Sequence, residues 1–211
     1  MKGKLLLKNS YDYTSYRKLI NQLVSEGKTT GPIQSQELFD FTKLNIQRMN
    51  RLDKTIAINS ELSNLINQMK YEQVWAVMAE AWCGDCAQII PVFEKIANAS
   101  SGRIELLIFL SEENPAIWDR VIRSAKHAIP YLIIVDRNSD NVIGMWGSRP
   151  EPANQIMLRW KANVDTISKS DFELELHTWY SKDKTVTLQN ELAQKISALE
   201  LMNCENKFLA K

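Results

Sequence analysis

The chain is poor in the residues that make disulfide frameworks or bind metals, with three cysteines and two histidines among 211 residues. A small secreted domain held together by disulfides needs more cysteines, so the sequence excludes that class. Every apolar run is shorter than the roughly 20 residues of a transmembrane helix, and no membrane span is expected. A formal net charge of +1 gives no reason to expect nucleic acid or an anionic membrane as a partner.

The composition that is present is typical of a soluble globular protein. Apolar residues make up 45% of the chain and charged residues 24%, and the length allows one domain of ordinary size plus an extension. The N-terminus has a basic start but only three consecutive leucines, which is too short for the apolar core of a signal peptide. A reducing cytoplasm is therefore the expected location.

Residues 1–70 are predicted to form a helical N-terminal extension. Between residues 13 and 70, apolar residues recur at helical spacing in three segments. The first segment stops at Gly27, Ser35 can cap the second, and the third runs from Ser60 to Lys70. Because each segment has an apolar stripe that needs a surface to cover, we expect these helices to pack on the rest of the protein.

The periodicity changes at residue 71, where apolar runs of strand length begin to alternate with helical segments. Alternation of this kind predicts an α/β fold with a mainly parallel sheet, and the last two strands are close enough to form a hairpin. Residues 71–211 are thus predicted to form one α/β domain. The expected strands are Val74–Ala79, Ile104–Leu110, Tyr131–Val135 and Val142–Trp146, and the expected helices are Cys86–Ala99, Pro115–Ala125 and 171–200.

The strongest functional signal is Cys83-Gly84-Asp85-Cys86, where the first apolar strand gives way to a helix. This spacing at a helix start places both sulfurs on one face, one turn apart, within reach of a disulfide. The unpaired N–H groups and the dipole of the helix favour negative charge on the first sulfur, and the thiolate is the nucleophile in thiol–disulfide exchange. The pair is therefore predicted to be redox-active.

Two other roles are open to such a pair of cysteines. A structural zinc site needs four ligands, and the remaining cysteine and histidines are Cys204, His127 and His177. None of these forms a second close pair, so no metal site is predicted. A pair that only helps the structure is the other alternative. Cys204 has no partner near it in the sequence, and a free thiol is expected there.

Around the cysteines, the segment Ala79–Cys86 resembles the active site of thioredoxins. Pro91, eight residues after Cys83, corresponds to the proline that bends their active-site helix. Further segments of the chain resemble a bacterial branch of thioredoxin-like proteins with a Trp-Cys-Gly-Asp-Cys site. This resemblance covers most of the chain. It implies a thioredoxin-like fold, with a central four-stranded mixed sheet flanked by helices. The matching segments are Thr30-Gly31-Pro32, Gln47-Arg48-Met49, Glu113-Asn114-Pro115, Asp119-Arg120, Asp136 and Trp146–Pro150.

The resemblance also implies a substrate groove beside the cysteines. Ile129-Pro130, at the start of a strand, corresponds to the cis-proline loop of thioredoxins, although a trans bond is the ordinary expectation for proline. A cis bond there would leave the Ile129 backbone free to pair with a substrate chain as an added strand. Gly147 corresponds to a glycine at the groove, and Trp82 is expected to cover the disulfide as a lid.

Two positions depart from typical thioredoxins. Those proteins have Gly-Pro between the cysteines, whereas this chain has Gly84-Asp85. A largely solvated Asp85 is expected to disfavour the neighbouring thiolate modestly, or simply to favour the first helical turn. Thioredoxins also have a buried acid six residues before the first cysteine, where this chain has Val77. The nearest acid is Glu80, which is either a displaced proton acceptor or, as we favour, a strand-end charge that reaches solvent.

The function predicted from these features is that of a thiol–disulfide oxidoreductase, acting in the cytoplasm as a protein disulfide reductase. The Cys83 thiolate forms a mixed disulfide with the substrate, and Cys86 then attacks Cys83 and releases the reduced substrate. The expected partners are protein or low-molecular-weight disulfides and a reductase or thiol that restores the electrons, with no bound cofactor. The alternatives are an adaptor module with a slow redox pair and, more weakly, a thiol peroxidase, which needs a peroxide pocket around Cys83.

Overall fold

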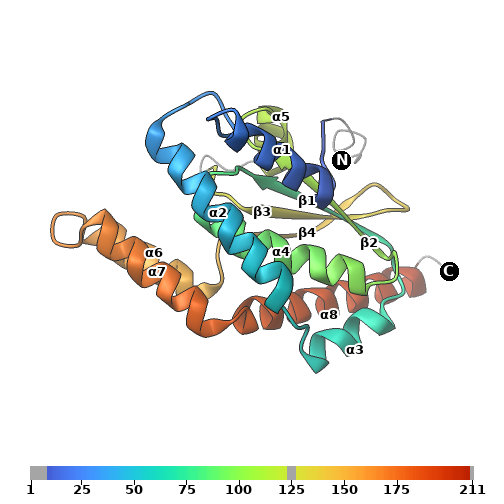
Figure 1. Ribbon diagram of the computed structural model, residues 1–211. Helices are drawn as coiled ribbons and strands as arrows, with labels where there is room; N and C mark the ends of the chain where they lie inside the picture. The colour runs from blue at the N-terminus through green and yellow to red at the C-terminus, as the bar shows by residue number, and fades with distance from the viewer. Residues whose placement is uncertain (1–8, 123–126, 210–211) are drawn as a thin grey trace.

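The computed structural model describes residues 9–122 and 127–209. It has an α/β fold with one mixed sheet in the order β2-β1-β3-β4, flanked by helices (Figure 1). Strand β1 pairs in parallel with β2 and antiparallel with β3, which continues into an antiparallel hairpin with β4. The predicted four-stranded mixed sheet is confirmed, but the expectation of a mainly parallel sheet is wrong, because β1–β2 is its one parallel pair and the other two pairs are antiparallel. The strands are β1 (Gln73–Ala79), β2 (Ile104–Leu110), β3 (Tyr131–Asp136) and β4 (Val142–Gly147).

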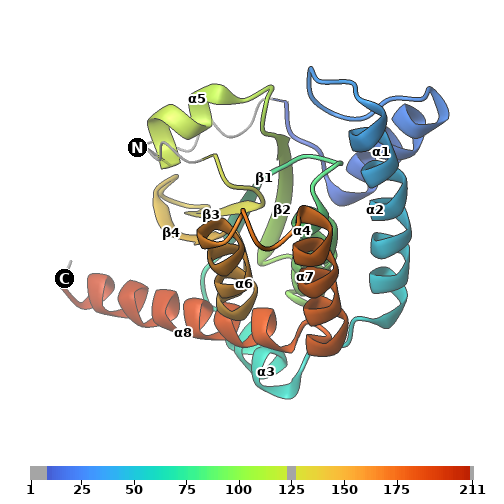
Figure 2. The same ribbon diagram turned by 90° about the vertical axis from the view of Figure 1, so that its left-hand side faces the viewer.

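Helices cover both faces of the sheet, and every residue of β1 is buried as a result. In Figures 1 and 2, α5 (Pro115–Ile117) and α8 (Val186–Leu209) lie on opposite sides of the sheet. Helix α4 (Gly84–Ala99) follows β1 directly, and its Phe93 ring meets Trp75 and Trp146 edge to face. This core fixes the start of α4 at the carboxyl end of β1.

The N-terminal segment forms three helices whose apolar residues join the same core. They are α1 (Tyr13–Ser25), α2 (Gln36–Thr55) and α3 (Ser60–Gln68). Each begins at a residue whose side chain accepts a hydrogen bond from the first turn. The division of the chain at residue 70 stays a prediction. The capping residues are Asp12, Ser35 and Asn59, and the buried apolar residues include Tyr16, Ile20, Met49, Leu52, Leu62 and Ile66.

The C-terminal third differs from the prediction. Helix α6 (Glu151–Ala162) was not expected. Prolines such as those at 150 and 152 are typical of turns, but proline is also tolerated in the first turn of a helix. The helix expected over 171–200 is instead α7 (Lys169–Asp183) and α8, because Lys184 and Thr185 adopt positive φ angles of 50° and 70°. In Figures 1 and 2, α6 and α7 run side by side as a pair.

The helix expected over Pro115–Ala125 is also irregular. Only α5 is regular, and a π-helical turn follows it from Trp118 to Ile122. The remainder of that prediction falls on 123–125, which lie outside the described residues. Within the described part of the chain, no helix is long and apolar enough to cross a membrane.

Candidate functional site

The two cysteines stand where β1 ends and α4 begins. Cys83 is the N-cap residue of α4: its N–H donates to the Glu80 carbonyl at 3.2 Å, and its own carbonyl accepts from the Ala87 N–H at 3.2 Å. Both cysteines are free thiols. Cys83 is 8% exposed and Cys86 1% exposed, so both thiols are buried and Cys86 is the more buried of the two.

Burial distinguishes the second thiol chemically. Desolvation and the adjacent Cys83 raise the pKa of the Cys86 thiol well above its ordinary value. Cys86 is therefore protonated at neutral pH in the reduced protein. Cys83, at the open end of the helix, has the unpaired N–H groups of the first turn beside it.

The residues predicted to form a substrate groove come together beside Cys83. The Cys83 thiol lies 3.6 Å from the Ile129 carbonyl oxygen, and the Ile129–Pro130 bond is cis. Gly147 pairs with Tyr131 across the hairpin and has a φ of +155°. A Cβ at position 147 would lie 2.9 Å from the Pro130 carbonyl oxygen, so only glycine fits there. Trp82 is partly exposed at the edge of this turn.

The expectation of a solvated Asp85 is wrong. Its side chain is buried, with 5% exposure, because α7 and the connection after β4 cover the first turn of α4. One carboxylate oxygen lies 2.5 Å from Arg149 Nη2, and the other accepts a hydrogen bond from the Tyr180 hydroxyl at 2.7 Å. Burial raises the pKa of Asp85, and the Arg149 charge opposes that shift. The charge of Asp85 is thus compensated inside the protein rather than screened by solvent.

The preferred interpretation of Glu80 as a charge that reaches solvent is also wrong. Glu80 is fully buried, and its Oε1 accepts a hydrogen bond from the Glu112 N–H at 3.0 Å. Its Oε2 is also buried. Desolvation raises the pKa of Glu80. A buried carboxyl of this kind can hold a proton close to the active-site turn, which keeps the proton-acceptor alternative open as a hypothesis.

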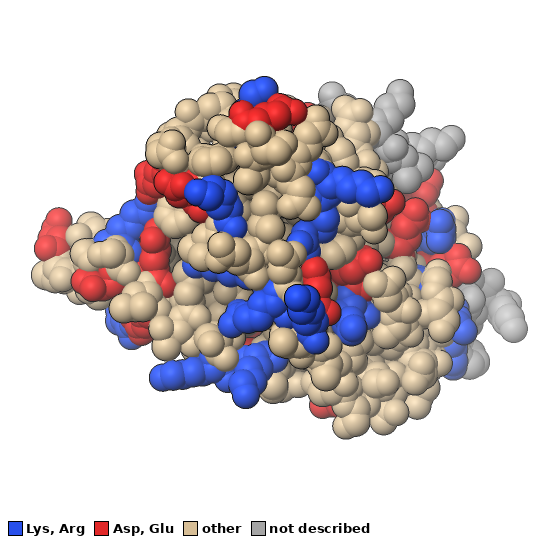
Figure 3. Space-filling model, viewed as in Figure 1, with Lys and Arg blue, Asp and Glu red and all other residues tan. Residues whose placement is uncertain are grey.

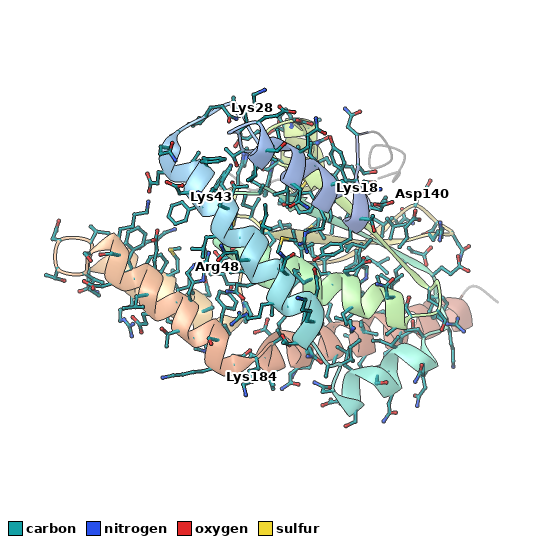
Figure 4. The ribbon with its side chains drawn as sticks, viewed as in Figure 1. Lys18, Lys28, Lys43, Arg48, Asp140 and Lys184 are labelled. Carbon is teal, nitrogen blue, oxygen red and sulfur yellow. The ribbon has the colours of Figure 1, made fainter. Side chains whose placement is uncertain are left out.

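The N-terminal segment holds the turn that precedes Cys83. Asn45 of α2 donates from Nδ2 to the Ala81 carbonyl at 2.8 Å, and the Ala81 N–H donates to the Thr30 hydroxyl at 2.8 Å. Arg48, one turn further along α2, donates from Nη1 to Asn45 Oδ1 at 2.8 Å. Figure 4 shows Arg48 between α2 and α7. None of these three side chains was predicted to belong to the site.

His177 of α7 explains why position 84 is a glycine. A Cβ on Gly84 would lie 2.9 Å from His177 Cε1 and 3.2 Å from Arg48 Nη1, so a side chain there would displace both. Burial, together with the Arg48 charge, lowers the pKa of His177 from 6.5 to about 4. The imidazole is therefore neutral at pH 7. It lies 3.4 Å from Gln88, through its Nδ1 atom.

The buried imidazole is expected to make the protein less stable in acid. Because the pKa of His177 is about 4 in the folded protein and 6.5 without burial, the unfolded chain binds the proton first, and stability falls as the pH drops from about 6.5 toward 4. The expected contribution of His177 to the loss of unfolding free energy between pH 7 and pH 5 is about 2 kcal/mol. Urea unfolding at the two pH values measures it.

Two variants isolate this contribution. His177→Gln removes the titrating ring and should reduce the acid-dependent loss by that amount. His127→Gln, which changes an exposed ring, is the matched histidine control. If His177→Gln and the wild type show the same pH dependence, the assignment of this loss of stability to His177 is contradicted.

The remaining candidates lie away from the turn or outside the described side chains. His127 is exposed, and its ring stacks on Trp118 with the centroids 4.6 Å apart. The side chain of Cys204 is not among those described. No cluster of three histidine, cysteine, aspartate or glutamate side chains that could hold a metal ion occurs among the described residues.

Comparison with known proteins identifies the family of this chain. A family model described as thioredoxin matches residues 31–169. The crystal structure of an HIV epitope-scaffold is similar in fold, with a TM-score of 0.53 at 15% identity over 90% of this chain and 97% of that one. A protein of unknown function from Pseudomonas aeruginosa has a TM-score of 0.46 at 16% identity over 86% and 99%. No curated protein sequence matches. Since the family model covers more than half of the sequence, the chain belongs to the thioredoxin family.

Proposed function

We propose that this protein is a thiol–disulfide oxidoreductase that reduces substrate disulfides with the Cys83–Cys86 dithiol. The observation that carries the proposal is the placement of two free thiols at the start of α4, with the more exposed one beside the Ile129-Pro130 loop. Membership of the thioredoxin family supports redox chemistry at this position. In a reducing compartment such as the cytoplasm, such a pair acts mainly as a reductant.

The proposed reaction has two exchange steps. The Cys83 thiolate attacks one sulfur of the substrate disulfide, that S–S bond breaks, and the departing sulfur leaves as a thiolate that takes up a proton. Cys86 then loses its proton and attacks Cys83, which breaks the mixed disulfide and releases the second substrate sulfur. Two electrons pass from the dithiol to the substrate, and a Cys83–Cys86 disulfide remains. A reductase or a small thiol returns the two electrons.

Charged side chains beside the turn support the first step. Arg48 is partly buried, and burial lowers its pKa, while the negative charges of Glu173 and Asp85 oppose that shift. Asp85 would oppose the thiolate, but its charge is paired with Arg149 at 2.5 Å. Cys83 itself is the N-cap residue of α4, where the helix dipole favours negative charge.

Turnover with dithiothreitol as the electron donor tests this proposal. The protein should accelerate the reduction of insulin or of bis(2-hydroxyethyl) disulfide above the rate with dithiothreitol alone. Oxidation should also remove two titratable thiols, which thiol counting and intact mass detect. The double variant Cys83→Ser/Cys86→Ser is the control and should show neither effect. If the wild-type protein accelerates the reduction of neither substrate, the proposed reductase function is ruled out.

A further inference from the structure

Both backbone polar groups of Ala81 are bonded to side chains of the N-terminal segment. Ala81 itself is 3% exposed. Its N–H donates to the Thr30 hydroxyl and its carbonyl accepts from Asn45 Nδ2, each at 2.8 Å, and these partners are 51 and 36 residues away in the sequence. A turn usually lies at the surface, where water satisfies such groups. This buried turn depends instead on two remote side chains, because a buried N–H or carbonyl without a partner is costly.

Ala81 is the second residue of the turn that ends at Cys83. The turn is closed by the hydrogen bond from the Cys83 N–H to the Glu80 carbonyl at 3.2 Å. Helix α4 begins directly after Cys83, and Cys86 belongs to its first turn. The backbone conformation at Ala81 therefore helps to set where the Cys83 sulfur lies relative to Cys86.

The loop that carries Thr30 also covers Glu80, the first residue of this turn. Gly31 has a φ of +81°, and a Cβ there would lie 3.7 Å from Glu80 Oε2. Burial raises the pKa of Glu80, and a hydrogen bond from the Thr30 side chain opposes that shift. The Thr30 hydroxyl thus contacts the turn twice, as an acceptor at Ala81 and as a donor at Glu80.

The polar side chains of α2 are divided between its two sides. Figure 3 shows Lys and Arg side chains on the outer surface of this helix. The buried polar residues of α2 are Thr42 and Asn45, which are 0% and 1% exposed. Thr42 bonds within the N-terminal segment, to the Thr29 hydroxyl at 2.5 Å and the Leu38 carbonyl at 2.8 Å, whereas Asn45 reaches the active-site turn. Of these two buried side chains, Asn45 is the one placed to hold the turn.

We propose that Thr30 and Asn45 are positioning residues for thiol–disulfide exchange, which hold the turn so that Cys86 is aligned to attack Cys83. The inference rests on the proposed reductase function and gives the N-terminal segment a part in it. In the step concerned, Cys86 loses its proton and attacks the Cys83 sulfur, the bond from Cys83 to the substrate half breaks, and that half leaves as a thiolate. An intramolecular attack depends steeply on alignment, and a misplacement of about 1 Å can cost a hundredfold in rate.

Stopped-flow absorbance with 5,5′-dithiobis(2-nitrobenzoate) separates the two exchange steps, because each half of this reagent absorbs once it is released. All proteins are pre-reduced and carry Cys204→Ser, so that only the active-site pair contributes thiols. The first half is released at a rate that depends on reagent concentration, and the second, which Cys86 expels, at a rate that does not. Thr30→Val should slow the second release about tenfold, the loss expected for one buried hydrogen bond, and leave the first within about threefold. Asn45→Ala should slow the same step.

The controls distinguish positioning from a general loss of packing. Thr30→Ser keeps the hydroxyl and should restore the second release, whereas Thr42→Val removes a buried hydroxyl that does not reach the turn and should leave both releases unchanged. Circular dichroism shows which variants are folded, and Asn45→Ala decides if Thr30→Val is not. A second release that is unchanged in the folded Thr30→Val, or equally slow in Thr42→Val, overturns the positioning assignment alone. Failure to release both halves when Thr30 and Asn45 are intact overturns the reductase itself.

Discussion

Replacement of Cys83 by serine is expected to abolish disulfide reduction, and replacement of Cys86 is expected to stop the reaction after its first step. Only Cys83 combines the N-cap position of α4 with proximity to the Ile129-Pro130 loop. A serine hydroxyl stays protonated at neutral pH and does not exchange with disulfides. Cys86 is 1% exposed and its pKa is raised by burial, so it cannot replace Cys83 as the first nucleophile.

Single-turnover kinetics measures this difference. Each pre-reduced protein is mixed with excess substrate in the absence of dithiothreitol. Wild type should release both halves of one substrate molecule as thiols, Cys86→Ser only one half, and Cys83→Ser neither. Cys204→Ser serves as the matched control and should behave as the wild type. Full release by Cys83→Ser would contradict the order of attack.

The second large effect concerns stability. Asp85→Ala is expected to lower the free energy of unfolding by about 3–5 kcal/mol, because it leaves the Arg149 guanidinium buried without its counter-ion. The pair is well buried, with side-chain exposures of 14% for Arg149 and 6% for Asp85. The variant also loses the acceptor for the buried Tyr180 hydroxyl.

The chain offers a matched control for this effect. Arg137 and Glu105 form an ion pair at 2.6 Å whose side chains are 44% and 41% exposed. Glu105→Ala should therefore cost about 1 kcal/mol or less. Urea unfolding of both variants at pH 7 compares the two pairs directly. Equal losses would show that the Asp85–Arg149 pair contributes no more than a surface pair.

The sheet could be predicted because its signal is local. Continuous apolar runs mark β1 and β2, and the polar turn between Val135 and Val142 marks the hairpin. The cysteine pair was found for a similar reason, since it follows the end of a predicted strand, whereas the groove residues were found through the resemblance to thioredoxins. Helix α6 was missed because its signal, a pair of prolines, also fits a turn.

The burial of the site could not be read from the sequence. Asp85 and Glu80 are acidic residues at a helix start and a strand end, where solvent exposure is the usual outcome. Segments remote in sequence bury both side chains instead. Tyr180, which contacts Asp85, is 95 residues from it, and Glu112, which contacts Glu80, is 32 residues from it. Arg48 and Arg149 lie in segments that resemble thioredoxin-like proteins, and that resemblance could have identified them. His177 carries no comparable signal in its helix.

The most direct test of the central claim is capture of a substrate half on Cys83. Pre-reduced Cys86→Ser and Cys83→Ser proteins are each incubated with bis(2-hydroxyethyl) disulfide at pH 7. The reaction is quenched with acid, and the mass of the intact protein is measured by mass spectrometry. Cys86→Ser is expected to gain the mass of one substrate half, with the adduct mapped to Cys83 by peptide digestion, and Cys83→Ser is expected to gain none at Cys86. Equal capture by the two variants, or capture at Cys86 alone, would contradict the assignment of Cys83 as the attacking thiol.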